Sequence, residues 1–267
     1  MNNYQQPILF IAHGSPMNAI ANNAYTKQIS TFANNLPLPK GIVMISAHWI
    51  TMNKTLVQVS NKLNTIYDFS GFPEELYNVN YKPLGSPELS HKIFNLLDLL
   101  KTTTTSINPQ LDYNDNLDHG AWSILKHMFP NANVPVVQIS IDYNLPHQAH
   151  FDIGQALSSL ANEGYLIIGS GNLIHNLMKA ERLNFSTSPS QHWASSLSND
   201  LSNAIYSNDF NKLINFNSIP FSNIGINTAD HYLPFLYSLG AGSNLTPQPI
   251  YKGFELGTLD MHSILWA

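Results

Sequence analysis

Short runs of apolar and β-branched residues, bounded by turn-forming residues, recur along the chain and predict buried strands. The runs at Gln6–Ala12 and Gly41–Ala47 have the length and composition of strands covered on both faces. Thr55–Ser60 shows the alternation of polar and apolar residues that is typical of a strand. Two further runs are again short and apolar: Val134–Ile141 and Gly164–Gly169. Together these runs predict a sheet that is buried beneath helices.

Longer segments between these runs have the spacing of amphipathic helices. Helices are predicted at Tyr25–Leu36, Ser86–Lys101, Ala121–Phe129, Gln148–Ala161 and Thr228–Leu239. In the second of these helices Ser86 is the predicted N-cap and Pro87 lies in the first turn. The last helix is predicted to be capped and amphipathic, with His231 in its first turn. Strands and helices alternate, so we predict an α/β fold with one domain over residues 1–267. The Asn/Ser-rich stretches 184–190 and 207–223 are predicted loops.

Composition narrows the classes of function. The 267 residues are 43% apolar, which is enough for one large hydrophobic core. The first apolar run, Ile8–Ala12, is strand-sized and has no basic leader before it, so we expect a cytoplasmic protein. The net charge of -5 and only 12 Lys and Arg residues, without a basic cluster, argue against nucleic-acid and membrane partners. Cysteine is absent, so any metal must be held by His, Asp, Glu or backbone oxygen.

Several common motifs are missing. Gly169–Gly171 follows a predicted strand but is not the Gly-x-Ser-x-Gly elbow of a serine hydrolase. The stretch 112–118 looks like the start of a calcium loop, yet Leu117 stands where glycine is needed and Ser123 where glutamate is needed. No glycine-rich nucleotide-binding motif occurs. The remaining unusual feature is histidine, with 11 residues in the chain.

Histidines follow the predicted strands at the points where the strands end. His13 comes directly after the first strand, His48 directly after the second, and His175 lies in the glycine-punctuated loop after the strand at Gly164–Gly169. In an open α/β sheet, ligands bind beyond the carboxyl ends of the strands, so these three side chains are expected at one edge. His119 and His231 occupy loop or helix-start positions that can face the same crevice.

Neutral imidazoles that converge on one point favour Zn²⁺ or Fe²⁺, whereas Mg²⁺ and Ca²⁺ prefer carboxylate oxygens. Asp118 and Asp230 each precede a histidine, and we consider both as groups that orient a neighbouring ring. The other histidines are interpreted as solvent-facing, capping or core residues: His91, His127, His147, His150, His192 and His262.

The chain resembles the class III extradiol ring-cleavage dioxygenases, in the branch of 4,5-DOPA-dioxygenase-like proteins, over nearly its whole length. The resemblance rests on six blocks in order: His13–Met17, Ile45–Trp49, Asp68–Pro73, Leu117–Trp122, Gly169–Asn176 and Asp230–Pro234.

The resemblance implies a single domain with a central mixed sheet flanked by helices, and a metal, Zn²⁺ or Fe²⁺, bound by His13, His48 and His231. His175 would be a fourth ligand or the acid/base, and His119 would contact substrate or dioxygen. The implied reaction opens the ring of a small catechol such as L-DOPA with O₂. Four aromatic residues are candidates either for the apolar wall around that flat ring or for the core: Trp49, Phe72, Trp122 and Tyr232.

Alternative functions remain open at this point. Non-heme oxygenases commonly use two histidines and one carboxylate, and a third histidine, His231, favours zinc retention. A zinc protein with a metal-activated water, perhaps hydrolytic in function, and a non-catalytic metal-binding module are therefore the other two hypotheses. The sequence does not indicate an oligomeric state.

Overall fold

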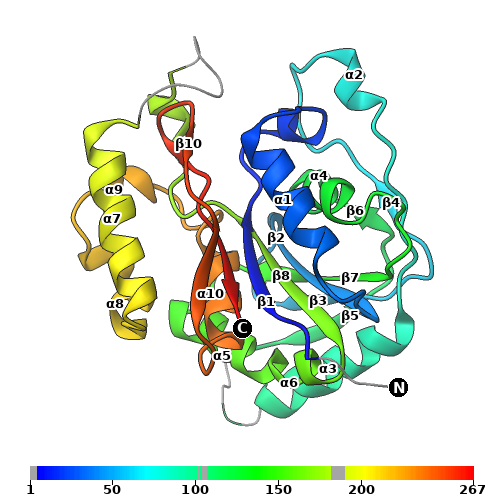
Figure 1. Cartoon of the computed structure of the whole chain (residues 1–267). Coiled ribbons are helices and arrows are strands. Elements are labelled where there is room, and N and C mark those ends of the chain that lie inside the picture. The colour runs from blue at the N-terminus through cyan, green and yellow to red at the C-terminus, as the bar shows by residue number, and fades with distance from the viewer. Residues whose placement is uncertain (1–4, 102, 104–106, 182–189) are drawn as a thin grey trace.

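The computed structural model describes residues 5–101, 103, 107–181 and 190–267, and within them the main strands join into one eight-stranded sheet (Figure 1). The strand order is β5-β3-β7-β2-β8-β1-β12-β9. The bounds of these strands are β1 Ile8–Ala12, β2 Gly41–Thr51, β3 Thr55–Gln58, β5 Pro109–Asp112, β7 Val136–Asp142, β8 Tyr165–Gly171, β9 Pro247–Tyr251 and β12 Ser263–Trp266. Two small ribbons lie apart from it, β4 Asn64–Thr65 with β6 Asn116–Leu117, and β10 Phe254–Glu255 with β11 Leu259–Asp260.

The middle of the sheet is parallel, and an antiparallel pair joins it to the outer strands on each side. Strands β7, β2, β8 and β1 run parallel to one another, whereas β12 and β9 add antiparallel strands on the β1 side. Strand β3 pairs antiparallel with β7 and parallel with β5. The predicted α/β class with a mixed central sheet is therefore confirmed. The parallel strands β1, β2 and β8 end at the same edge, which is where the site forms.

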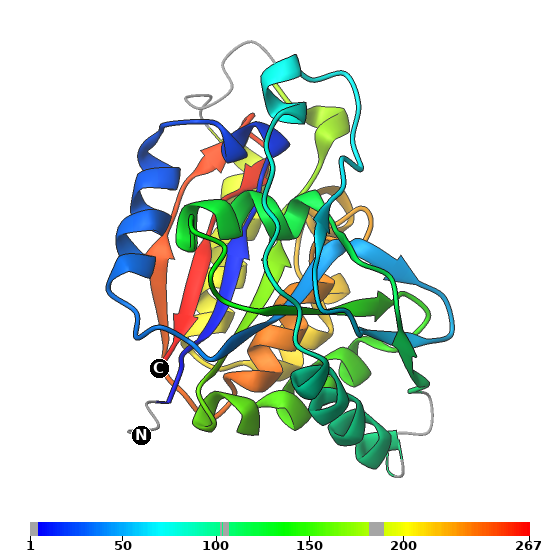
Figure 2. The same cartoon turned by 90° about the vertical axis from the view of Figure 1, so that its right-hand side faces the viewer.

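Helices cover both faces of the sheet (Figure 2). Helices α1 and α4 contribute to the core on one face, and α3, α5, α7 and α10 contribute to the core on the other. The helices are α1 Ala24–Asn34, α2 Glu74–Tyr77, α3 Pro87–Lys101, α4 His119–Met128, α5 His147–Leu157, α6 Ser159–Asn162, α7 His192–Tyr206, α8 Phe210–Ile214, α9 Ser222–Gly225 and α10 Leu233–Ala241. No helix in the described ranges has the length and apolar character that a bilayer crossing requires. The expected cytoplasmic location and the extent of a single domain over 1–267 stay predictions.

The alternation of side chains along β1 builds both cores at once. Ile8 and Phe10 are buried in the core on the α10 side, and Leu9 and Ile11 are buried in the core on the α1 side. Each such side chain contributes about 1.5–3 kcal/mol when it is fully buried. The sheet edge that carries the site is therefore held by well-packed strands.

Two helical expectations differ from the structure. The stretch 207–223, predicted as a loop, contains α8, the 3-10 turn Phe216–Ser218 and the start of α9. The prediction was wrong because Leu213 and Ile219 are buried against the core despite the polar residues around them. The predicted helix at Gln148–Ala161 is divided at Ser158 into α5 and α6. The predicted loop 184–190 lies outside the described residues except for residue 190.

Candidate metal centre

His13 stands at the carboxyl end of β1, as predicted. Its backbone N–H donates to the carbonyl of Gly171 at 3.1 Å, which extends the parallel pairing of β1 with β8. Its Nδ1 is 3.0 Å from the hydroxyl of Ser170, which leaves Nε2 free to face the centre. The chain then turns sharply at Gly14, whose φ of +60° favours glycine. A Cβ at this position would also lie only 2.6 Å from the Glu255 carboxylate.

His48 lies within β2 rather than after it, which corrects the predicted strand boundary. The pairing of β2 with β7 loses its register between Ile45 and Ile50, so the intervening residues form a bulge. Ser46 holds this bulge, because its hydroxyl donates to Asp118 at 2.5 Å and accepts from the His48 N–H at 3.3 Å. Bulges re-aim side chains, and this one directs the His48 ring toward His13.

His231 precedes α10 rather than lying in its first turn. The prediction placed the helix start too early, because residues 229–232 form a hydrogen-bonded turn and Pro234 occupies the first turn of α10. The helix is buried along its whole length, so it is not amphipathic, and Tyr232 makes no side-chain cap. The carbonyl of His231 accepts from the Asn172 N–H at 2.9 Å, which ties the turn to the end of β8.

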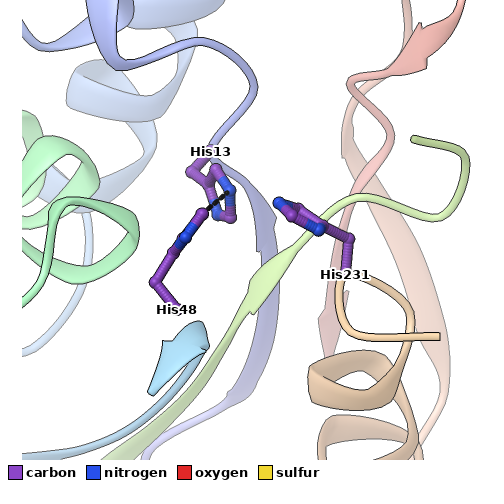
Figure 3. Close-up of side chains that lie close together, drawn as sticks. All are labelled: His13, His48 and His231. Carbon is purple, nitrogen blue, oxygen red and sulfur yellow. Dashed lines mark hydrogen bonds between the residues drawn. The ribbon is translucent and has the colours of Figure 1, made fainter. Parts of the chain in front are cut away.

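The rings of His13, His48 and His231 face one another across a small gap (Figure 3). One ring nitrogen from each lies within 4.8 Å of the other two. The Nε2 atoms of His13 and His48 are 3.1 Å apart, and the His231 ring centroid lies 5.2 Å from that of His13 and 5.0 Å from that of His48. Three imidazoles from three separate segments therefore converge on one point.

Protonation and orientation of these rings suit a metal. Burial lowers the pKa of His13 well below its ordinary value, and the neighbouring His48 lowers it further. Burial likewise lowers the pKa of His48, followed by the effect of His119. The Nδ1 of His231 is 3.0 Å from the Asp230 carboxylate, which can only accept, so Nδ1 carries the proton and Nε2 is free. Imidazole nitrogens arranged in this way fit a borderline divalent ion such as Zn²⁺ or Fe²⁺.

His175 stacks on His231 but does not join the three-histidine group. The two ring centroids are 3.6 Å apart and the rings are nearly parallel, at 4°. The backbone of His175 is held by a hydrogen bond to the Gly225 carbonyl at 2.9 Å and by a bridge to Leu259. Burial lowers the pKa of His175 to about 3, with a further contribution from His231, so the ring is neutral.

His119 is held by Asp68, a residue for which the sequence predicted no role. The carboxylate accepts from the backbone N–H of His119 and from its Nδ1, both at 2.9 Å. Burial alone would raise the pKa of Asp68, but these hydrogen bonds lower it below its usual value. Asp118, predicted to orient a ring, instead caps α4 by accepting from the Ala121 N–H and bonds to Ser46. The one signal in the sequence that could have pointed to Asp68 was the position of this residue in the block Asp68–Pro73.

A cavity of about 630 Å³ opens beside the histidines. His48, His119, His175 and His231 form its polar wall together with Asp68. The rest of the wall is largely apolar: Pro16, Phe69, Phe72, Leu177, Leu256 and Leu259. Of the four aromatic candidates for this wall, Phe72 lines the cavity, whereas Trp122 and Tyr232 are fully buried in the core and Trp49 lines a neighbouring pocket.

Comparison with known proteins decides the family. The model of the LigB family, described as the catalytic LigB subunit of aromatic ring-opening dioxygenase, matches residues 6–253. The chain belongs to this family. The predicted enzyme class, an extradiol ring-cleavage dioxygenase, is thereby confirmed. Members of the family use a non-heme metal, and the three-histidine cluster is placed to hold one.

Relatives of this LigB-family chain match it almost end to end. A 4,5-DOPA dioxygenase extradiol from Escherichia coli K12 is 36% identical over 269 residues, covering 99% of this chain and 96% of the relative. A protein of the same name from Beta vulgaris is 34% identical, covering 95% of this chain and 94% of the relative. The crystal structure of the uncharacterized Escherichia coli K12 protein JW3007 is similar with a TM-score of 0.82 and 32% identity, and the match covers 98% of this chain and all of that one.

Asp230→Asn is expected to weaken metal binding in this LigB-family protein by about 10–100-fold, because the carboxylate orients His231 and makes its ring a better donor. The affinity is measured by competition with a coloured chelator. Asp200→Asn, on α7, is the matched control and leaves the affinity unchanged. An unaltered affinity in Asp230→Asn would show that His231 needs no such partner.

Gly171→Ala is expected to destabilise the fold by about 1–3 kcal/mol, the usual cost of overpacking. A Cβ at this position would lie 2.1 Å from the His231 carbonyl oxygen, so the turn that carries His231 must move. Urea unfolding measures the loss, and a chelator competition measures the accompanying fall in metal affinity. Gly41→Ala, whose added Cβ meets its neighbours at 3.4 Å, is the control that keeps both.

Proposed function

We propose that this chain is a metal-dependent extradiol dioxygenase that opens the ring of a small catechol, such as L-DOPA, with O₂. The observation that carries the proposal is the convergence of His13, His48 and His231, two of which, His48 and His231, line a cavity whose wall is otherwise largely apolar. A flat aromatic ring suits the apolar wall, and its two hydroxyl groups suit the histidine end. The relatives named 4,5-DOPA dioxygenase extradiol support the choice of substrate.

The metal ligands in this proposal are His13, His48 and His231, and the bound ion is Fe²⁺ in the active form, although Zn²⁺ fits the same donors. A ferrous ion held there supplies the redox chemistry that reaction with dioxygen requires, which Zn²⁺ cannot supply because it has no accessible second oxidation state. The hydrogen bonds from His13 Nδ1 to Ser170, whose hydroxyl donates to the Gly120 carbonyl, and from His231 Nδ1 to Asp230 fix the ring orientations before any ion binds.

His175 is assigned the role of acid/base. It lines the cavity, stacks on a proposed ligand and stays outside the three-histidine group, so its ring nitrogens are free for proton transfer. A neutral imidazole has one nitrogen with a free lone pair, which accepts the proton that a catechol hydroxyl loses. The same ring then returns the proton to the product.

His119 is assigned to substrate contact. Because the Asp68 carboxylate can only accept, Nδ1 of His119 donates the hydrogen bond, and Nε2 is the ring nitrogen left to contact substrate. That nitrogen can accept a hydrogen bond from a hydroxyl of a catechol in the cavity, whose wall includes both residues. Asp68 therefore acts as a positioning residue, because it holds the ring through two hydrogen bonds.

A zinc hydrolase is the second candidate function, and one observation favours it. The three-histidine group contains no carboxylate, and three histidines with one open position are the ligand set of a zinc site that activates water. In that reading, His175 would serve as the proton acceptor for the water.

Oxygen uptake separates the two functions. Protein reconstituted anaerobically with Fe²⁺ and a parallel sample loaded with Zn²⁺ are mixed with L-DOPA and with a panel of other catechols. We expect oxygen consumption and a yellow semialdehyde product in the iron sample alone. Silence of the iron sample across the panel, together with ester hydrolysis by the zinc sample, would replace the proposal with the hydrolase.

A further inference from the structure

A second group of potential ligands lies beside the first. His48, Asp68 and His119 each offer one ligand atom within 4.8 Å of the other two. The Nδ1 of His119 lies 2.9 Å from Oδ2 of Asp68, and the Nδ1 of His48 lies 3.7 Å from the same oxygen. All three residues line the 630 Å³ cavity, so solvent and small molecules reach this point.

His48 belongs to both groups and presents a different nitrogen to each. Its Nε2 is 3.1 Å from Nε2 of His13 in the first group, and its Nδ1 faces Asp68 in the second. The ring centroids of His48 and His119 are only 3.8 Å apart. The imidazole of His48 therefore stands between two clusters of donors.

The spacing of the donor atoms agrees with ligation of a single ion. Nitrogen and oxygen ligands lie about 2.0–2.2 Å from a divalent transition metal, so two ligands at right angles are about 3 Å apart and wider angles separate them further. The distances of 2.9 Å and 3.7 Å to Asp68 fall within that range.

The donor types differ from those of the first group. Two histidines and one carboxylate are the set that binds Fe²⁺ in many non-heme oxygenases, and the remaining coordination positions stay open to solvent. The first group supplies no charge to offset a divalent ion, whereas Asp68 supplies one negative charge here. Asp68 is the part of the group that solvent reaches best, with 23% of its side chain exposed.

We propose that the chain holds a second divalent metal ion at His48, Asp68 and His119, joined to the first ion through the imidazole of His48. The proposal rests on the proposed function for its first ion, at His13, His48 and His231. The hydrogen bond from His119 Nδ1 to Asp68 is present when no ion is bound at this second position. When the second ion binds, it replaces the proton on Nδ1 of His119. It also replaces the ring proton of His48. Both protons are released to solvent.

Metal stoichiometry tests this proposal without any assay of turnover. Apo-protein is dialysed to equilibrium against rising Co²⁺ concentrations, and cobalt and protein are measured in each sample. We expect the wild type to saturate at two ions per chain, Asp68→Asn at one, and His13→Ala at one. Asp200→Asn, a carboxylate change on α7, keeps two. Saturation of the wild type at one ion that Asp68→Asn retains overturns the second position.

The outcomes separate the second position from the proposed function. One ion that is lost in His13→Ala but kept in Asp68→Asn leaves the proposed first site intact and overturns the second. No bound cobalt in the wild type contradicts both. Crystals of the wild type grown with Co²⁺ give an independent test that needs no variant: two anomalous peaks, one beside Asp68, support the proposal, and a single peak overturns it.

Discussion

His48→Ala is expected to reduce bound metal to near zero and to abolish ring opening. Loss of a partner that merely orients a ligand costs about 10–100-fold in metal affinity, and loss of a ligand itself costs more. His48 is the residue shared by both ligand groups, so its removal leaves neither group with three donors. The measurement is metal content after gel filtration, followed by oxygen uptake with a catechol.

The matched control for this variant is His91→Ala, because His91 is an exposed histidine on α3 that does not line the cavity. It is expected to retain wild-type metal content and turnover. The fold of His48→Ala is checked by circular dichroism, since the side chain is only partly buried and its loss should not unfold the sheet. Full metal occupancy with normal turnover in His48→Ala would remove it from the ligand set.

His175→Ala is expected to keep its metal and to lower kcat by about 10²–10⁴-fold, the usual contribution of a general acid/base. The ring lies outside the three-histidine group and stacks on His231, so its removal takes away the proton acceptor and leaves the donors. Metal analysis and steady-state kinetics on one preparation measure both quantities.

The two readouts distinguish the roles that the sequence left open for His175. Retained metal with low kcat identifies the acid/base, whereas an empty site identifies a fourth ligand and strengthens the case for zinc. Unchanged kcat would refute the assignment. His192→Ala, an exposed histidine at the start of α7, is the control and is expected to change neither.

The strands and the edge that carries the site could be predicted from the sequence because their signals are local. An apolar run that ends at His13 predicts both the strand and the place where its side chain emerges. His48 was placed at the right edge but on the wrong side of the strand end. The bulge that holds it depends on Ser46 and on Asp118, which lies 72 residues away in the chain, so no local pattern could show it.

Residues that reach the site from irregular segments were harder to predict. Asp68 lies in a loop, and its partner His119 is 51 residues further along, so this pairing appears only once the chain is folded. His231 lies in the histidine cluster, yet its helix begins later than expected, because the start of α10 is set by the turn around Ala229 and by Pro234. Tertiary contacts, rather than helical periodicity, decide these positions.

The most direct test of the proposed function is the fate of dioxygen. The iron-reconstituted protein is allowed to turn over L-DOPA under isotopically labelled dioxygen in ordinary water, and the mass of the product is measured before its oxygens exchange. A dioxygenase is predicted to yield a ring-opened product that carries both labelled atoms. A product without label, or one labelled only when the water is labelled instead, would contradict ring opening by dioxygen and favour the hydrolytic function.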